Sequence, residues 1–552
     1  MAKDRTSGPT TPEPGITGEP AATQKHPPSD TENPTDVRER PLSSDGSPGD
    51  VPGSGSPSQV AVEDQAGPPR RGSRRSAYAE RDLTSGSVRR NLWFLAWPQV
   101  ADSGLNVGDQ LIDLVWAGMS VGARGIAGIG AAQTYIFLIR LGRQGIDMAM
   151  RAMIARAVGA GDLRLANHVA VQAFMLNLAL AFITIIPGIL LTEHLLRFLG
   201  VSQAVVDAGA GYMKVQFVAS FAQGFRMMAG AALQASGDTY TPMRASLVAR
   251  VVDWVLTPFI VFGWWGLPEM GLVGIAWVNT LSGAIGLAIN AWGLFTGTSK
   301  LRLTFRGFYL DPRLIGRIFW IGLPATVTSM DRSLSQLILL GVVARFGDFA
   351  LAAFYLARRL ETVAMMAGMG MGQATGVIAS QNLGAGKPQR AKETVYWALG
   401  IVILFQVVLG ILFFAFPLFF LSIFSREPEL LEIGDTWLRI LVLGFCLMAV
   451  MQVYQLTYQI AGDTLVAMIT TICTVWAVEL PLAILLSGGG ILGWTLPSYM
   501  NLGQFGVAWA VVIGVGCRLL VYVPYFYWGP WTRKRVIEGL TVRPGRAWGG
   551  SE

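Results

Sequence analysis

The first long apolar stretch of the sequence carries four polar side chains at helical spacing. Asp102, Asn106, Asp109 and Asp113 follow one another at steps of four, three and four residues. In an α-helix, these steps put all four side chains on one face. Carboxylates inside a membrane helix are costly and tend to be functional. We therefore expect Asp113 and Asp109 to bind a coupling cation; the alternative is a stripe that only hydrogen-bonds neighbouring helices.

The fifth apolar stretch supplies a second acidic position. Asp253 and Thr257 lie four residues apart and share a helix face. Two carboxylates close together can share one proton, and their oxygens can instead bind Na⁺. We expect H⁺ or Na⁺ to bind Asp253 and Asp113. Arg250 precedes Asp253 by three residues, so an internal Arg250–Asp253 ion pair is the competing interpretation.

The second half of the sequence contains further candidates inside apolar stretches. They are the acids Asp331, Glu361 and Glu479, which could form a second-half site or line a cavity. Arg358 lies one turn before Glu361, which favours a structural ion pair there.

A methionine cluster, Met365, Met366, Met369 and Met371, alternates with Gly368, Gly370 and Gly372. Core packing is the ordinary role of such methionines, and a pliable wall for varied ligands is the alternative. The glycines predict a bent or closely packed helix.

The elements that carry these residues are long and apolar. The chain has 552 residues, of which 52% are hydrophobic and 14% charged, whereas soluble domains carry about 25% charged residues. Stretches of roughly 20 apolar residues can cross a bilayer as helices, which satisfy their own backbone hydrogen bonds there. We predict an all-α polytopic membrane protein with twelve transmembrane helices, at 91–118, 126–150, 166–192, 204–235, 242–264, 270–296, 312–341, 349–376, 392–423, 431–461, 464–487 and 505–529.

The charged residues between these stretches predict the topology. Loops after even-numbered stretches are basic, as is the segment after the last one, whereas residues 425–435 are acidic. Cytoplasmic loops keep an excess of Lys and Arg. We therefore predict a multi-pass protein of the cytoplasmic (inner) membrane with both termini in the cytoplasm. Its first 88 residues hold thirteen prolines and one aromatic residue, which predicts a disordered tail.

Three motifs occur twice. Residues 159–161 and 384–386 both read Gly-Ala-Gly, and the Ala-Gly-Asp-Thr at 461–464 matches Ser-Gly-Asp-Thr at 236–239, in both cases 225 positions later. Gly274–Trp277 returns, with one substitution, as Gly506–Trp509. Glycine accepts the left-handed backbone that ends helices, and aspartate caps the next helix. We predict two six-helix lobes, at 89–300 and 312–530, related by a pseudo-two-fold axis along the membrane normal, with a linker at 301–311 and a C-terminal tail at 531–552.

Several other classes of protein are disfavoured. The three cysteines, Cys446, Cys473 and Cys517, lie in apolar stretches and define neither a disulfide framework nor a metal site. The net charge of +7 comes mainly from residues beside helix ends and does not indicate nucleic-acid binding. Zinc, nucleophile-elbow and phosphate-loop motifs are missing from the sequence, so we expect no enzyme, no cofactor and no ATP-driven pump. We also expect a monomer.

The repeated motifs resemble those of the MATE family, the multidrug and toxic compound extrusion transporters, in its bacterial form. The matching residues are Trp97-Pro98, Leu323-Pro324, Gln234–Thr239 with Thr241–Met243, and Asn382–Lys387 with Arg390-Ala391. The resemblance covers about residues 91–530. It implies two lobes around a central cavity and export of organic solutes, expected to be cationic or amphipathic, by antiport with H⁺ or Na⁺.

The resemblance also bears on single residues. Leu111–Trp116 is similar to the segment that carries the family's cation-responsive aspartate, which implies that role for Asp113. The family's helix 5 aspartate stands one turn later than Asp253, at Thr257, and Asn279 stands where the family often has threonine. The acid that another branch of the family carries on helix 10 falls at about Met448. These matches favour the first lobe as the coupling lobe.

One alternative substrate class stays open. Five arginines stand in or beside apolar stretches, at positions 140, 143, 151, 226 and 332. Basic residues of this kind would suit a lipid-linked or anionic cell-envelope precursor. Binding of anionic compounds rather than cationic dyes would distinguish this alternative.

Overall fold

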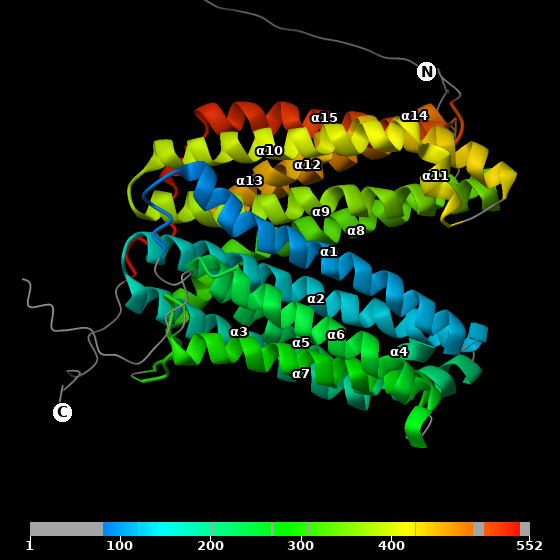
Figure 1. The fold of residues 1–552 in the computed structure, drawn as a ribbon, viewed down its shortest axis with the longest axis horizontal. Helices are drawn as coiled ribbons and strands as arrows, with labels where there is room; N and C mark the ends of the chain where they lie inside the picture. The colour runs from blue at the N-terminus through cyan, green and yellow to red at the C-terminus, as the bar shows by residue number, and fades with distance from the viewer. Residues whose placement is uncertain are drawn as a thin grey trace, which may run out of the picture. The chain divides into compact units, whose positions relative to one another are not determined.

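Long helices account for almost all of the ordered chain (Figure 1). The computed structural model describes residues 81–120, 122–200, 203–266, 270–297, 299–306, 308–424, 427–488 and 502–540, without most of the side chains between 107 and 131. The first lobe comprises α1 (Val88–Ser120), α2 (Gly122–Gly159), α3 (Leu163–Leu190), α4 (Thr192–Phe198), α5 (Gln203–Ser236), α6 (Tyr240–Phe262) and α7 (Gly271–Thr296). The second lobe comprises α8 (Pro312–Val343), α9 (Asp348–Gly384), α10 (Pro388–Ala415), α11 (Pro417–Ser422), α12 (Pro428–Ile460), α13 (Thr464–Thr474), the π-helix η3 (Val475–Glu479), α14 (Leu480–Ser487) and α15 (Phe505–Trp528).

Each of the twelve predicted stretches coincides with a long helix, if α13, η3 and α14 are taken as one. Within the described residues, seven of these helices are long and apolar enough to cross a membrane by length and composition alone. They are α3, α6, α7, α10, α12, α13–α14 and α15. The other five are α1, α2, α5, α8 and α9.

The repeated motifs end helices, as predicted. Gly159 is the last residue of α2 and Gly384 the last of α9. Gly161 and Gly386 follow them with φ of +79° and +72°, a left-handed backbone that favours glycine. Asp238 receives hydrogen bonds from the backbone N–H and the hydroxyl of Thr241 at the start of α6, at 3.0 and 2.7 Å.

The predicted cap at Asp463 is wrong. Its side chain makes no capping bond to α13; instead it accepts a hydrogen bond from Tyr525 and lies 3.1 Å from Nζ of Lys534. The ammonium of Lys534 stabilises the carboxylate more than a backbone N–H would.

The first helix of each lobe lies against the second helix of the other lobe. α1 runs along α9, and α8 runs along α2. Glycines permit the approach: a Cβ on Gly145 of α2 would lie 2.5 Å from the Gly322 carbonyl of α8, and a Cβ on Gly370 of α9 would lie 2.7 Å from Cα of Val100 of α1. Gly145 and Gly370 are 225 positions apart. The close packing predicted for the glycine alternation in α9 is therefore confirmed, and the two contacts form the seam between the lobes.

The segments that flank the lobes are partly packed onto them. The predicted tail lies outside the described residues as far as residue 80, but Leu83 is buried at 2% exposure, and Lys387 donates to the carbonyl of Thr84 at 2.9 Å. Trp531 and Val536, beyond the last long helix, are also buried. In the linker, Thr304 exchanges two hydrogen bonds with Asn167 of α3. Short segments at both ends of the lobes thus belong to the folded core.

Candidate functional site

The first lobe contains a buried polar cluster between α1 and α6. Asp109 on α1 forms an ion pair with Arg250 on α6 and accepts a hydrogen bond from Nε1 of Trp254 at 3.2 Å. Arg250 also donates to Asn106 at 2.9 Å. Asn106 and Asp109 therefore share a helix face, as their spacing predicts. The alternative pairing of Arg250 with Asp253 is wrong, because the guanidinium crosses to α1.

Asp253 lies in the same lobe and differs from Asp109 in its partners. Its side chain is 2% exposed and accepts a hydrogen bond of 3.4 Å from the hydroxyl of Ser282 on α7. Among the described residues it has no ion-pair partner. A buried carboxylate with one weak hydrogen bond retains unused acceptor capacity. Among the acids of α1 and α6 whose side chains the structure describes, Asp253 is the one that is both buried and without an ion-pair partner.

Three other residues with side-chain oxygens stand near Asp253 on α6 or on the neighbouring helix α7, and of these Ser282 contacts the carboxylate. Thr257, buried one turn after Asp253, donates its hydroxyl to the Asp253 carbonyl at 2.7 Å and keeps its oxygen as an acceptor. Asn279 is half-buried on α7, one turn before Ser282, whose hydroxyl contacts the Asn279 carbonyl at 3.2 Å. Carboxylate, hydroxyl and amide oxygens are the hard ligands that alkali cations accept, and the same carboxylate can hold a proton.

Asp113 belongs to α1, but the structure does not describe its side chain. The prediction that it binds the coupling ion thus remains a prediction. Asp102, two turns earlier than Asp109, is half-buried, and one of its oxygens has no hydrogen-bond partner in the described structure.

The second lobe contains an aspartate–tryptophan pair like that of the first. Asp331 on α8 accepts a hydrogen bond of 2.6 Å from Nε1 of Trp476, which stands 145 positions later, as Trp254 does after Asp109. Asp331 is buried, and its other oxygen has no partner among the described residues. Asp331 stands 222 positions after Asp109, whereas the repeated motifs are 225 positions apart. The second pair therefore lies about one turn nearer to the start of its helices than the repeat would place it.

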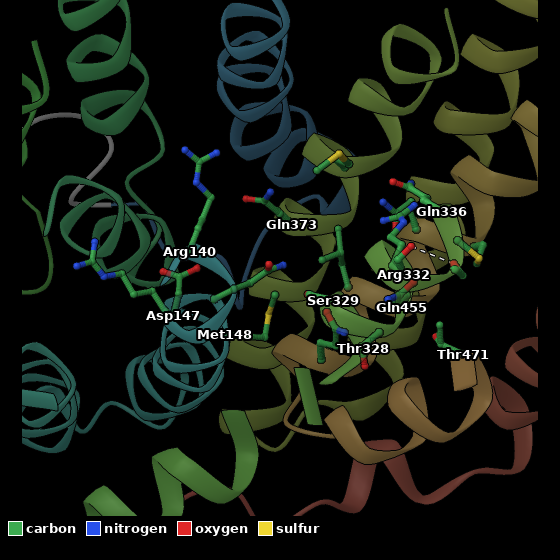
Figure 2. Close-up of a pocket in the computed structure, with 18 of the residues that line it drawn as sticks. Arg140, Asp147, Met148, Thr328, Ser329, Arg332, Gln336, Gln373, Gln455 and Thr471 are labelled. Atoms are coloured by element: carbon green, nitrogen blue, oxygen red, sulfur yellow. Dashed lines mark hydrogen bonds between the residues drawn. The ribbon is translucent and has the colours of Figure 1, made fainter. Parts of the chain in front are cut away.

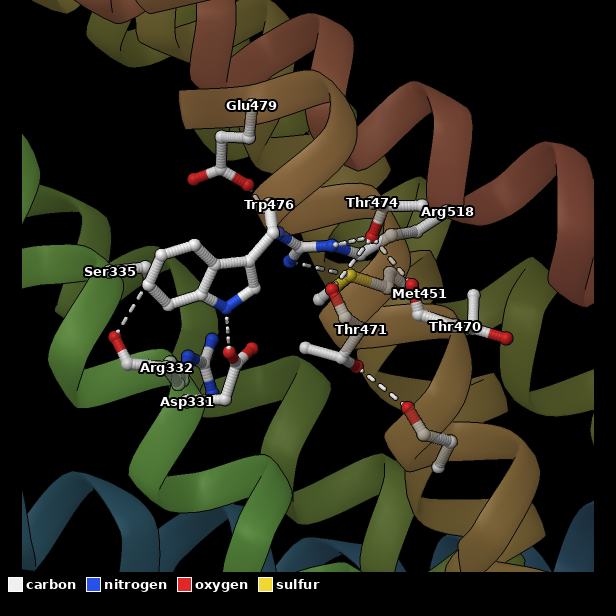
Figure 3. A network of polar contacts seen from close by, with 11 residues as sticks. Asp331, Arg332, Ser335, Met451, Thr470, Thr471, Thr474, Trp476, Glu479 and Arg518 are labelled. Carbon is white, nitrogen blue, oxygen red and sulfur yellow. Dashed lines mark hydrogen bonds and ion pairs between the residues drawn. The ribbon is translucent and has the colours of Figure 1, made fainter. Parts of the chain in front are cut away.

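The two glutamates of the second lobe are paired. Glu361 binds Arg358 at 2.6 Å, which confirms the predicted ion pair. Glu479 binds Arg518 of α15, whose Nε also donates to Thr474 at 2.9 Å (Figure 3). Glu479 follows Asp463 by one residue more than Asp253 follows Asp238, and the π-helix that ends at Glu479 accommodates the extra residue. Glu479 is therefore the salt-bridged counterpart of Asp253.

A central cavity of about 370 Å³ lies between the lobes (Figure 2). Its walls come from α2, α3 and α5 on one side and from α8, α9, α12, α13, η3 and α15 on the other. Of the methionine cluster, Met369 lines the cavity, whereas Met365 is buried beside it and lies 3.9 Å from the guanidinium of Arg332. Met369 thus belongs to the cavity wall and Met365 to the buried core, and the role of the cluster in accepting varied ligands stays a prediction.

The described residues hold no group of three His, Cys, Asp or Glu side chains suited to a transition metal. The oxygens at the candidate site come mostly from uncharged groups around a single carboxylate. Such a set suits a monovalent ion or a proton and not a tightly held divalent metal.

Sequence reasoning missed four participants. They are Ser282, Trp254, Trp476 and Arg518. Ser282 could have been found, since it stands three residues after Asn279 on one helix face, and Arg518 stands out as a charge within an apolar stretch. No sequence signal identifies the tryptophans, because apolar surroundings are ordinary for their rings.

Comparison with known proteins agrees with this architecture. The MatE family model matches residues 102–259 and 324–485. The chain is 24% identical over 457 residues to a protein named "Probable multidrug resistance protein YoeA" from Bacillus subtilis, with 82% of this chain and 96% of that protein covered. It is also 24% identical over 467 residues to "Probable multidrug resistance protein NorM" from Thermotoga maritima, covering 83% of this chain and 96% of that one.

The fold is shared with solved structures. One is the outward-facing conformation of a multidrug resistance MATE family transporter, with a TM-score of 0.74 and 21% identity over 83% of this chain and 98% of that chain. The predicted fold of twelve helices in two lobes is confirmed. Because the family model matches more than half of the sequence, the chain belongs to the MatE family of membrane transporters.

Proposed function

We propose that the chain is a secondary active efflux transporter that exports organic compounds by antiport with H⁺ or Na⁺. The observation that carries this proposal is the buried carboxylate of Asp253, which lacks an ion-pair partner among the described residues and lies in a lobe that borders a central cavity. The related proteins named for multidrug resistance support the direction of transport.

The coupling mechanism follows from the charge of this carboxylate. An ionised Asp253 is costly inside the lobe unless a cation compensates it. Binding of H⁺ or Na⁺ removes that cost and favours the helix arrangement that best excludes water from the site. The Asp109–Arg250 pair holds α1 against α6 and transmits a shift of either helix to the other. Coupling then requires only that the cation and the exported compound favour different arrangements.

The two helix contacts of the seam, α1 with α9 and α8 with α2, allow the lobes to move against each other. α1 and α8 each contact both lobes, so a rocking motion of one lobe against the other moves them together. The cavity between the lobes would open to one side of the membrane in each arrangement. We also propose that the end of the lobes that carries the Gly159 and Gly384 turns faces the cytoplasm, since basic residues gather there.

Transport in proteoliposomes tests the coupling. A pH gradient and a Na⁺ gradient are imposed separately, and efflux of a fluorescent substrate is followed. We expect Asp253→Asn and Asp113→Asn to abolish gradient-driven efflux while expression and insertion are unchanged. Asp207→Asn, which changes an exposed acid bonded only to Gln203, serves as the matched control and should transport normally. Full coupled transport by Asp253→Asn would refute its role, and failure of both gradients to drive the wild type would refute antiport.

Asp109→Asn separates the two acids of the lobe. It removes the partner of Arg250 and leaves that guanidinium buried without an ion pair. We expect lower thermal stability as well as lost transport, whereas Asp253→Asn should lose transport alone. A stability loss of equal size in both variants would show that Asp253, too, is a structural residue.

A further inference from the structure

The charges that line the central cavity do not balance. Six arginines line it, at positions 140, 143, 151, 332, 358 and 518, together with three acids, Asp147, Glu361 and Glu479. Each acid is already paired: Asp147 with Arg151 at 2.9 Å, Glu361 with Arg358 at 2.6 Å, and Glu479 with Arg518. Each of the three negative charges is therefore already compensated by an arginine of the cavity wall.

Three arginines remain without a carboxylate in the part of the chain that the structure describes. Arg143 donates to the backbone carbonyl of Ser220, but its Nε and one terminal nitrogen are buried with no partner. Within the described residues, the guanidinium of Arg332 contacts the sulfur of Met365 at 3.9 Å. Arg140 is exposed to the cavity and makes no hydrogen bond or ion pair with the described residues. Arg140 and Arg143 come from α2 and Arg332 from α8, so the two lobes both contribute. Figure 2 labels Arg140 and Arg332.

The rest of the lining does not suit an organic cation. None of the described lining residues is aromatic, although aromatic faces are a usual means of holding organic cations. Glutamines supply amide donors, among them Gln336, Gln373 and Gln455, and methionines supply pliable apolar surface. Such a wall accepts a charged group on an apolar body.

We propose that the cavity binds amphipathic organic anions, compounds with a carboxylate, sulfonate or phosphate on an apolar body, and that Arg140, Arg143 and Arg332 bind the anionic group. The proposal rests on the proposed export function and names its substrate class. A guanidinium presents a planar fork of donors that matches these anions. Arg143 and Arg332 are half-buried, so their guanidinium groups are costly without a compensating charge, and an anion from solution offsets that cost.

Equilibrium binding to the purified full-length protein tests the class without any gradient. Carboxyfluorescein is the anionic probe and ethidium the cationic probe, each followed by fluorescence anisotropy. We expect carboxyfluorescein to bind at least about tenfold more tightly than ethidium. We expect Arg140→Gln and Arg332→Gln each to weaken carboxyfluorescein about tenfold or more, the cost of one lost charge-assisted hydrogen bond. Tighter binding of ethidium, or unchanged anion affinity in both variants, would overturn the proposal.

Two controls make the result specific. Arg345→Gln removes the same charge from an exposed position outside the cavity, so it should leave both affinities unchanged. Arg332→Lys keeps the charge but loses the fork, and should bind the anion with intermediate affinity. Neither Arg140→Gln nor Arg332→Gln leaves a carboxylate without its partner, so their melting temperatures should equal or exceed that of the wild type. If either variant melts at a lower temperature, the anion affinity of Arg332→Lys takes its place as the test.

Two further experiments distinguish a soluble anion from a lipid headgroup, and a wrong substrate class from a wrong export function. Binding is repeated in nanodiscs of phosphatidylcholine with and without phosphatidylglycerol. Competitive displacement of the dye by the anionic lipid would overturn the assignment to soluble anions and assign the site to lipid headgroups. If carboxyfluorescein binds as expected but neither ion gradient drives its efflux, the export function fails while the substrate class stands.

Discussion

Arg156 and Gln381 stand 225 positions apart, and each donates a hydrogen bond to a backbone carbonyl of the opposite lobe. Gln381 of α9 donates to the carbonyl of Ala235 in the first lobe at 2.9 Å, and Arg156 of α2 donates to the carbonyl of Ala461 in the second lobe at 3.2 Å. Ala461 is the first residue of the repeated motif in the second half, and Ala235 directly precedes the motif in the first half. The duplicated sequence therefore forms a two-sided latch at the end of the lobes where α2 and α9 stop.

The first prediction concerns this latch. Gln381→Ala should favour the arrangement in which this end is open, because a backbone carbonyl loses its partner at a cost of about 1–3 kcal/mol, roughly a tenfold change in the equilibrium. Spin labels at positions 164 and 389, on a cysteine-free background, would report a larger population of long distances. Gln203→Ala, which removes an exposed glutamine bonded only to Asp207, is the control. An unchanged distance distribution in Gln381→Ala would contradict the latch.

The second prediction concerns the seam glycines. Gly145→Ala and Gly370→Ala each insert a Cβ against backbone of the opposite lobe, and overpacking of this kind costs about 1–3 kcal/mol. We expect lower melting temperatures in detergent and reduced transport. Gly316→Ala and Gly400→Ala are matched helical controls, since a Cβ at either position meets nothing within 4 Å; these should be neutral or slightly stabilising. Equal melting temperatures in the two sets would show that the seam can separate without cost.

The third prediction concerns the Glu479–Arg518 pair. Arg518→Met leaves a buried carboxylate without compensation, which costs about 3–5 kcal/mol. The double variant Arg518→Met, Glu479→Leu should recover much of that stability. Thermal unfolding of the two variants beside Glu479→Gln measures the coupling. If the double variant is no more stable than Arg518→Met, the pair is not what stabilises α15 against the π-helix.

The fourth prediction concerns the turn before α6, where Asp238 is buried at 2% exposure. Burial raises the pKa of this carboxyl above 3.8, although the hydrogen bonds from Thr241 oppose the shift. Because the native state then binds the proton more tightly than the unfolded state, the stability from this group is fully present below pH 3.8 and is lost as the pH rises through the native pKa. Relative to Asp238→Asn, the wild type should therefore lose stability as the pH rises through this range. If the wild type instead gained stability relative to Asp238→Asn as the pH rises, the pKa of Asp238 would be lowered on folding and not raised.

The number and order of the helices followed from the sequence, because apolar stretches of membrane-spanning length carry their own signal. Helix ends followed from the two Gly-Ala-Gly motifs, since few residues accept the left-handed backbone that Gly161 and Gly386 adopt. The shared face of Asn106 and Asp109 also followed from spacing alone. Each of these features depends on residues close together in the chain.

Only the tertiary structure decided which acids are paired. Arg250 lies one turn from Asp253 but binds Asp109, and Arg518 reaches Glu479 from a different helix. The excess of three arginines in the cavity likewise becomes visible only when residues from both lobes are brought together. Sequence determines which face of a helix a side chain occupies, whereas the packing of that face against other helices determines its charge environment. That is why the lobes and their symmetry could be predicted, and the partners of each buried charge could not.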